Sequence, residues 1–334
     1  MLGALFAVLS AATFAFNNAA MRRGVITGTP IQGMAITIPI GLLCFFPAAL
    51  VVAATTGVPH LALAGTAWMA GVGIVHFIIG RYCNYRANQE AGVNLTAPVV
   101  QLQVAVAVIL AVVVLHEPCT VLQAIGGIVM LAGSLVTQRQ PHEPAGAASR
   151  DKPAAAPEPT FLPRRAAGYL FASLAALGYG TSPIMARIAL EHTSPATGVI
   201  GGLIAYAAAT AAIATGLVSR TFRKNVGGLQ RENLRWFLYS GLFVATAQGF
   251  NYAALSIAPI MLVAPILQLS LVFRFVFANA LTPDHEVWGR LVIIGSVLSI
   301  AGACAISIDT DLIVHALALP QGIADVLRWR IAGG

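Results

Sequence analysis

The sequence predicts an all-α polytopic membrane protein with ten transmembrane helices, arranged as two inverted five-helix repeats. First, 58% of the 334 residues are hydrophobic and only 9% are charged, with a mean hydropathy of +0.81. Second, the apolar residues fall into runs of span length. Third, polar and proline landmarks recur in the same order in both halves. Soluble domains carry about a quarter charged residues, so this composition indicates a chain that resides in lipid.

Ten apolar runs are each close to the ~20 residues that cross a bilayer. Each must be helical, because lipid offers no hydrogen-bond partner to free backbone groups. The predicted spans are residues 3–21, 31–54, 64–85, 93–115 and 119–138, followed by 167–189, 196–218, 234–256, 259–281 and 287–308.

The repeat is visible in two short pairs of residues. Asn84-Tyr85 and Ala97-Pro98 in the first half recur as Asn251-Tyr252 and Ala264-Pro265 in the second. Five spans per repeat is an odd number, so the second repeat enters the membrane from the opposite face, which is the inverted topology of many transporters. We therefore divide the chain into a first repeat (1–138), a linker (139–166), a second repeat (167–308) and a tail (309–334).

The linker and the tail differ in composition. The linker holds six prolines among alanine and scattered charges between Arg139 and Arg165, which is typical of a disordered segment. In the tail, Ile323, Val326 and Leu327 recur at helical spacing. This pattern predicts a short helix in the membrane interface, with a frayed terminus as the alternative.

Charge and cysteine content argue against several classes of protein. The net charge of +7 is better explained by membrane topology than by nucleic-acid binding. The four cysteines show no paired spacing, so we expect neither a disulfide framework nor a metal site. His116-Glu117 and Asp284-His285-Glu286 lack metalloprotease spacing and fall in turns. No cofactor is expected, and the oligomeric state is left open.

These features together resemble a known family. The two five-helix halves, the asparagine–tyrosine and alanine–proline landmarks, and a glutamate before a glycine-bearing fifth helix are similar to the EamA-type transporters of the drug/metabolite transporter superfamily. The resemblance covers residues 4–138 and 167–306. It implies a membrane transporter rather than an enzyme. Many family members have an arginine in the second helix of a repeat, and residues 31–54 and 196–218 contain none.

Polar side chains within the spans are the candidate substrate ligands, because polar groups are costly in lipid and usually face the bundle or a water-filled cavity. The alternative is that they join helices by hydrogen bonds. Arg81 and Asn88 lie near the predicted end of the third span, where they would meet water. The candidates for a cavity lining are Asn17, Asn18, Asn84, Tyr85, Gln101, Tyr179, Ser182, Gln248, Asn251, Tyr252, Gln268 and Arg274.

Prolines and a lone arginine complete the set of candidates. Pro98 and Pro265 are predicted to kink the fourth and ninth spans and to act as hinges, and Ser182-Pro183 is predicted to break the sixth span locally. Arg274 falls inside the ninth span, where it either faces a cavity or extends toward the nearer membrane surface. His76 is either a proton relay or a packing residue.

The predicted function is secondary transport of a small polar metabolite, with alternating access between the repeats. A lining rich in amides and arginine and free of acids favours a carboxylate-bearing substrate, such as an amino acid, and we expect export across a bacterial inner membrane. A lipid-modifying membrane enzyme and a non-transporting structural membrane protein are the alternatives.

Lysine and arginine counts place both termini outside the cytoplasm, whereas the family resemblance implies the reverse.

Overall fold

The computed structural model describes the chain over most of its length. The described residues are 2–57, 61–116, 119–138, 162–190, 195–257, 266–267, 269–281, 289–307 and 310–332. The predicted hinge residue Pro265, the predicted ligand Gln268 and most of the linker lie outside them.

The first half of the chain folds almost entirely into helices. They are α1 (Leu2–Thr27), α2 (Pro30–Thr56), α3 (Leu63–Val72), the π-helical η1 (Gly73–Gly80), α4 (Arg81–Ala91), α5 (Val93–Val100), α6 (Gln103–Leu115) and α7 (Val121–Gln138), with the short strand β1 (Cys119–Thr120) before α7.

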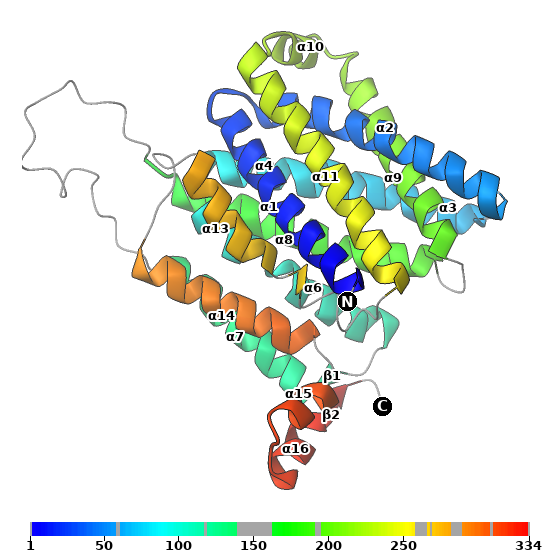
Figure 1. Ribbon diagram of the computed structural model, residues 1–334. Helices are drawn as coiled ribbons and strands as arrows, with labels where there is room; N and C mark the ends of the chain where they lie inside the picture. The colour runs from blue at the N-terminus through cyan, green and yellow to red at the C-terminus, as the bar shows by residue number, and fades with distance from the viewer. Residues whose placement is uncertain are drawn as a thin grey trace, which may run out of the picture.

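The second half is also helical. Its elements are α8 (Arg165–Leu190), α9 (Pro195–Gly216), α10 (Arg220–Gly227), α11 (Arg231–Ile257), α13 (Leu269–Leu281) and α14 (Arg290–Ser307), and the tail adds α15 (Thr310–Ala316), α16 (Gln321–Arg328) and β2 (Arg330–Ala332). Figure 1 shows the long helices packed side by side, with α10 at one end and α15 and α16 near the other.

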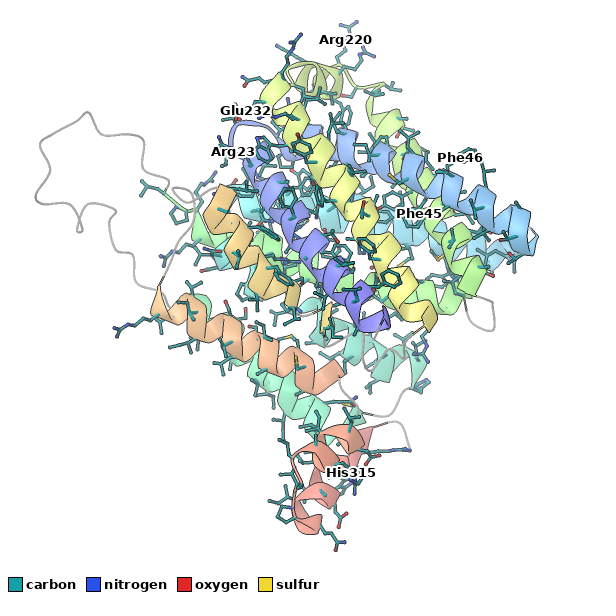
Figure 2. The ribbon with its side chains drawn as sticks, viewed as in Figure 1. Arg23, Phe45, Phe46, Arg220, Glu232 and His315 are labelled. Carbon is teal, nitrogen blue, oxygen red and sulfur yellow. The ribbon has the colours of Figure 1, made fainter. Side chains whose placement is uncertain are left out.

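Among the described residues, five helices are long and apolar enough to cross a membrane. They cover residues 3–27, 30–56, 63–91, 93–115 and 196–216. Large apolar side chains such as Phe46 are exposed on the outside of the bundle, and Figure 2 shows Phe46 pointing away from it. A helix surface that faces lipid has this character.

Local sequence explains where these helices begin and end. Thr29 caps α2 through a capping box. Its side-chain hydroxyl accepts from the backbone N–H of Gln32, and the side-chain oxygen of Gln32 accepts from the backbone N–H of Thr29. Gly92 has a φ of 81° between α4 and α5, a conformation that glycine adopts without a steric penalty. The third span was predicted to end at residue 85. The helix instead continues to Ala91 and ends at Gly92.

The extension corrects the prediction that Arg81 and Asn88 meet water. Arg81 is 4% exposed and Asn88 is 2% exposed, because both lie well inside the helix and face other helices. Arg22 is also buried, and it donates to the backbone carbonyls of Asn88 and Gln89 near the end of α4.

Pro98 lies inside α5, two residues before the helix is interrupted. Proline has no N–H for the carbonyl of Asn94, one turn earlier. At 101–102 the chain makes shorter-range bonds, from Leu102 N to Val99 O at 3.1 Å and from Val104 N to Gln101 O at 3.1 Å. The fourth apolar segment is therefore divided into α5 and α6.

Pro183 behaves differently, and the predicted break in the sixth span is wrong. Helix α8 runs without interruption from Arg165 to Leu190 with Pro183 inside it. The carbonyl of Tyr179 cannot receive a backbone N–H from Pro183, but the Ser182 hydroxyl donates to it at 3.2 Å. The side chain replaces the missing donor, so the helix continues.

Helices from the two halves pack together in matched pairs. Helix α1 packs along α11, α4 along α8, α2 along α9, and α7 along α14. In the last pair, a Cβ on Gly133 would lie 2.5 Å from the carbonyl oxygen of Gly295, and a Cβ on Gly302 would lie 2.5 Å from that of Gly126. Because the later residue of one helix meets the earlier residue of the other, α7 and α14 run antiparallel.

Candidate functional site

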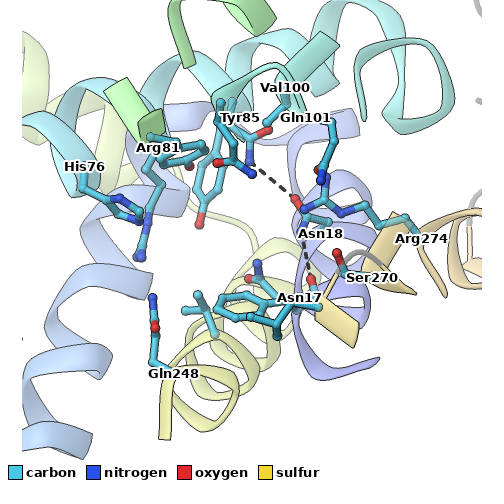
Figure 3. A pocket seen from close by; sticks show the side chains of 16 residues that line it. Asn17, Asn18, His76, Arg81, Tyr85, Val100, Gln101, Gln248, Ser270 and Arg274 are labelled. Atoms are coloured by element: carbon cyan, nitrogen blue, oxygen red, sulfur yellow. Dashed lines mark hydrogen bonds between the residues drawn. The ribbon is translucent and has the colours of Figure 1, made fainter. Parts of the chain in front are cut away.

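A pocket of about 250 Å³ lies at mid-length of the long helices. Its walls come from α1, η1, α4, the α5–α6 junction, α8, α11 and α13, so both halves of the chain contribute. Figure 3 shows the polar side chains that point into it. The lining residues are Phe14, Asn17, Asn18, His76, Arg81, Asn84, Tyr85, Val100, Gln101, Gln103, Tyr179, Val244, Gln248, Leu267, Ser270 and Arg274.

Arg81 brings a positive charge to the wall formed by α4. Its Nη1 donates to Thr37 Oγ1 at 3.4 Å and its Nη2 donates to the Tyr206 hydroxyl at 3.5 Å. Its guanidinium also lies 4.9 Å from the ring centroid of Phe77, within range of a cation–π interaction. These neutral partners position the guanidinium without neutralising its charge.

Arg274 brings a second positive charge, from α13. Figure 3 shows Arg274 and Arg81 on opposite sides of the pocket. The Nε of Arg274 is buried and has no hydrogen-bond partner among the described residues. Of the two alternatives for this residue, the structure favours the cavity over the membrane surface. Among the described lining residues there is no aspartate or glutamate.

Three asparagines connect the pocket walls by side-chain hydrogen bonds. Asn84 Nδ2 donates to Asn18 Oδ1 at 3.4 Å, and Asn18 Nδ2 donates to the carbonyl of Phe14 at 2.7 Å. On the neighbouring position of α1, Asn17 Oδ1 accepts from Ser240 Oγ of α11 at 2.6 Å. The amides of α1 are thereby held toward the pocket by partners in both halves.

A second layer of hydrogen bonds fixes Asn84 from behind. Asn88 Nδ2 donates to Asn84 Oδ1 at 3.0 Å and to the Asn84 carbonyl at 2.7 Å. Thr96 Oγ1 in turn donates to Asn88 Oδ1 at 2.8 Å. Asn88 therefore acts through Asn84 and is not itself a lining residue.

His76 and two tyrosines complete the polar wall. His76 Nδ1 lies 2.7 Å from Ser182 Oγ, and its ring centroid lies 4.6 Å from that of Tyr179. The Tyr85 hydroxyl lies 3.1 Å from Thr37 Oγ1. The Ser182 hydroxyl therefore contacts both the His76 ring and the Tyr179 carbonyl, and it fixes the orientation of the imidazole at the pocket wall.

Comparison with protein families gives one match that spans most of the chain. Residues 1–138 and 166–308 match the EamA-like transporter family. The chain belongs to the EamA-like transporter family. It is therefore a polytopic integral membrane protein of the drug/metabolite transporter type. No curated protein matches it. One solved structure, described only as the crystal structure of a protein, has 16% sequence identity and a TM-score of 0.49, over 95% of this chain and 98% of its own.

Most of the polar residues predicted for this EamA transporter do line the pocket, although their role in binding stays a prediction. Ser182 does not line it directly and instead contacts His76. Asn251 belongs to α11 but is not among the lining residues, and its Oδ1 is buried without a partner. The Tyr252 side chain and all of Gln268 lie outside the described residues. Pro98 also does not line the pocket.

The sequence did not identify every lining residue of the transporter. Arg81 was assigned to water because the end of the third span was misjudged, and the glycine stop at Gly92 was the available signal. Ser270 lies four residues before Arg274 and therefore on the same helix face, so its position could have identified it. Gln103 follows the interruption at 101–102, and its spacing from Gln101 carries no such signal. The apolar lining residues Phe14, Val100, Val244 and Leu267 carry no such signal.

Proposed function

We propose that this protein exports a small, carboxylate-bearing polar metabolite, such as an amino acid, across the bacterial inner membrane by alternating access. The observation that carries the proposal is the pairing of Arg81 and Arg274 in one buried pocket whose described lining contains no acid. A buried charge is stable only when it is paired or well hydrogen-bonded, and a substrate carboxylate would supply the missing negative charge.

The remaining lining suits the polar part of such a substrate. Asn17, Asn18, Gln101 and Gln248 provide amide donors and acceptors, and Tyr85 and Tyr179 provide hydroxyl groups beside ring surfaces. The pocket volume of about 250 Å³ is near the lower end of the ~300–1,000 Å³ of ligand pockets. A small metabolite fits this volume better than a drug-sized compound.

The packing of α7 and α14 supports two inverted repeats of five spans each. Gly133 meets Gly295 while Gly302 meets Gly126, and the sequence repeat equates Gly133 with Gly302 and Gly126 with Gly295. The same pair of contacts is therefore made twice, as across a local two-fold axis. Equivalent helices that run antiparallel are what inverted repeats require.

Contacts at the end of the bundle near α10 support a closed access path on that side. Arg23 of α1 pairs with Glu232 of α11 at 3.4 Å, and Figure 2 shows both at this end. Thr27 Oγ1 donates to Asn233 Oδ1 at 2.9 Å. Each contact joins the two halves, so opening the pocket toward this end requires both contacts to separate.

Flux measured with matched pairs of substrates tests the proposal. Purified protein in lipid vesicles is offered amino acids and the corresponding amino acid amides, which differ in the carboxylate. We expect the acids to raise the thermal unfolding temperature and to be transported, and the amides to do neither. Equal transport of acids and amides would contradict the carboxylate assignment, and absence of any flux across a broad metabolite panel would favour a structural membrane protein.

A further inference from the structure

The tail beyond the family match is folded and attached to the bundle. The match ends at residue 308, yet α15, α16 and β2 follow it. Strand β2 pairs antiparallel with β1, and Val121 N donates to the Trp329 carbonyl at 2.9 Å. The hydroxyls of Thr120 and Thr310 lie 2.7 Å apart. These contacts tie both ends of the tail to the residues just before α7.

The tail carries more exposed apolar surface than a solvated segment of its length needs. Five large apolar side chains of the tail are between 51% and 71% exposed. They lie in α15, the following turn, α16 and just after it, and they are Leu312, Leu317, Ile323, Val326 and Trp329. Several large exposed apolar side chains within one short segment indicate an interaction site. In α16, Ala324 is buried while Ile323 and Val326 face outward.

The charges of the tail do not favour an ionic partner. Arg328 Nε donates to Asp311 Oδ1 at 2.5 Å, so these two charges pair with each other. The remaining exposed charges of the described tail, Asp325 and Arg330, are of opposite sign. The surface is therefore apolar with little net charge, and its partner must be apolar as well.

The attachment point places this surface at the edge of the bilayer. Strand β1 lies between the apolar helices α6 and α7, so it lies where the chain turns at a membrane surface. An apolar groove of about 350 Å³ starts at Cys119 of β1 and continues along residues such as Ile109, Val112 and Ile128. Acyl chains fit this groove, and Figure 1 shows α15 and α16 beside the start of α7.

We propose that residues 310–332 form a membrane-surface anchor, in which Trp329, Ile323 and Val326 insert at the boundary between lipid headgroups and acyl chains. Tryptophan and short amphipathic helices have this position in common. The bilayer is favoured as the partner because the tail is attached at Cys119, which pairs with Ala332 and also lines the apolar groove of α6 and α7. The strand pair with β1 holds the anchor against the start of α7.

Fluorescence quenching of Trp329 tests the anchor. In the full chain, Trp68, Trp236 and Trp288 are replaced by phenylalanine, and the protein is placed in vesicles with or without lipids brominated on the acyl chain. We expect the brominated lipids to remove most of the Trp329 emission and aqueous iodide to have little effect. Quenching by iodide alone would overturn the proposal, and protection from both quenchers would show that a second copy or another protein covers this face.

Two further measurements extend the test, and the second does not depend on the tryptophan replacements. Adding Ile323→Asp and Val326→Asp should make Trp329 accessible to iodide, whereas Asp325→Asn, on the same exposed side of α16, should not. The unaltered protein, irradiated in vesicles containing a photoreactive lipid, should carry label on peptides from residues 310–332. Labelling confined to the long helices would overturn the anchor even if the variants failed to fold.

Discussion

Arg81 and Arg274 each bring a guanidinium into a pocket that is otherwise neutral among its described residues. Within the described part of the chain, neither is held as a structural ion pair: Arg81 contacts hydroxyls and a ring, and the Nε of Arg274 has no partner there. A charged group with spare hydrogen-bonding capacity in a cavity is available to a ligand in a way that a paired charge is not.

Replacing one of these arginines is therefore expected to weaken substrate binding. Arg274→Gln removes a charge-assisted hydrogen bond, which contributes about 1.5–3 kcal/mol, so the apparent KM for a carboxylate substrate should rise about 10- to 100-fold. The measurement is concentration-dependent flux in vesicles. Arg220→Gln, an exposed arginine at the start of α10, is the control and should leave the KM unchanged; an unchanged KM in Arg274→Gln would remove this arginine from the site.

Single residues could be predicted where lipid makes a polar group costly. Asn17, Asn84 and Gln248 fall within predicted apolar spans, so their place in a cavity lining was predicted from the sequence. Arg81 did not follow, because its assignment depended on where a helix ended. The orientation of His76 also did not follow, because it depends on Ser182, which lies 106 positions away along the chain.

The interruption between α5 and α6 lies beside the pocket, since Val100, Gln101 and Gln103 all contribute to the lining. We expect Pro98→Ala together with Pro265→Ala to keep the protein inserted but to slow transport. Restoring the N–H groups favours a continuous helix and so opposes bending at this point. Flux per inserted molecule is the measurement, and an unchanged rate would leave Pro98 with a packing role only.

The contact between α7 and α14 depends on glycine at two positions. Gly133→Ala and Gly302→Ala each place a methyl group 2.5 Å from a backbone carbonyl oxygen, which cannot move without moving its helix. Overpacking of this kind costs about 1–3 kcal/mol. Both variants should therefore lower the thermal unfolding temperature of the purified protein, and by similar amounts, since the two contacts are alike.

Gly127 provides a matched control on the same helix. A Cβ at Gly127 would have no atom within 4 Å, so Gly127→Ala should be neutral or slightly stabilising, as alanine favours helices over glycine. If Gly133→Ala proved as stable as Gly127→Ala, the close approach of the two helices would be contradicted.

Helices were predictable as elements, but their internal irregularities were only partly so. Apolar length identified the segments, and proline correctly marked a change in the fourth. The same rule failed for Pro183, because the Ser182 hydroxyl replaces the missing donor there. Whether a proline interrupts a helix depends on such a local contact, and residue type alone does not specify it.

At the scale of the whole molecule, positive charge is gathered at the end of the bundle near α10. When Arg22, Arg81 and Arg187, which lie within helices, are left out, thirteen lysines and arginines fall on the linker's side of the predicted spans and two on the side of the termini. Figure 2 shows Arg23 and Arg220 at this end and His315 near the other. Because connections rich in lysine and arginine stay in the cytoplasm, we predict that both termini lie outside it.

A reporter enzyme that is active only outside the cytoplasm measures this orientation. Fused after Gly334 it should be active, and inserted near Ala155 it should be silent. The reverse pattern would show that the usual family orientation holds and that the charge distribution is misleading in this chain.

The arrangement of the two halves was more predictable than the tail. Polar and proline landmarks recur in order, so a contribution of both halves to one pocket was expected from the repeat. The docking of β2 on β1 did not, because two- and three-residue strands carry no periodic signal and their pairing joins residues about 200 positions apart.

Arg22 shows how one side chain can act at two times in the life of the protein. Its guanidinium is 1% exposed and donates to the carbonyls of Asn88 and Gln89. Synthesis proceeds from the N-terminus, so Arg22 is made more than sixty residues before those carbonyls exist. During that interval the charge is not yet held by α4, and in the predicted orientation it would help to retain the end of α1 in the cytoplasm. Once α4 has inserted, the same charge caps that helix, and the predicted orientation would no longer depend on it.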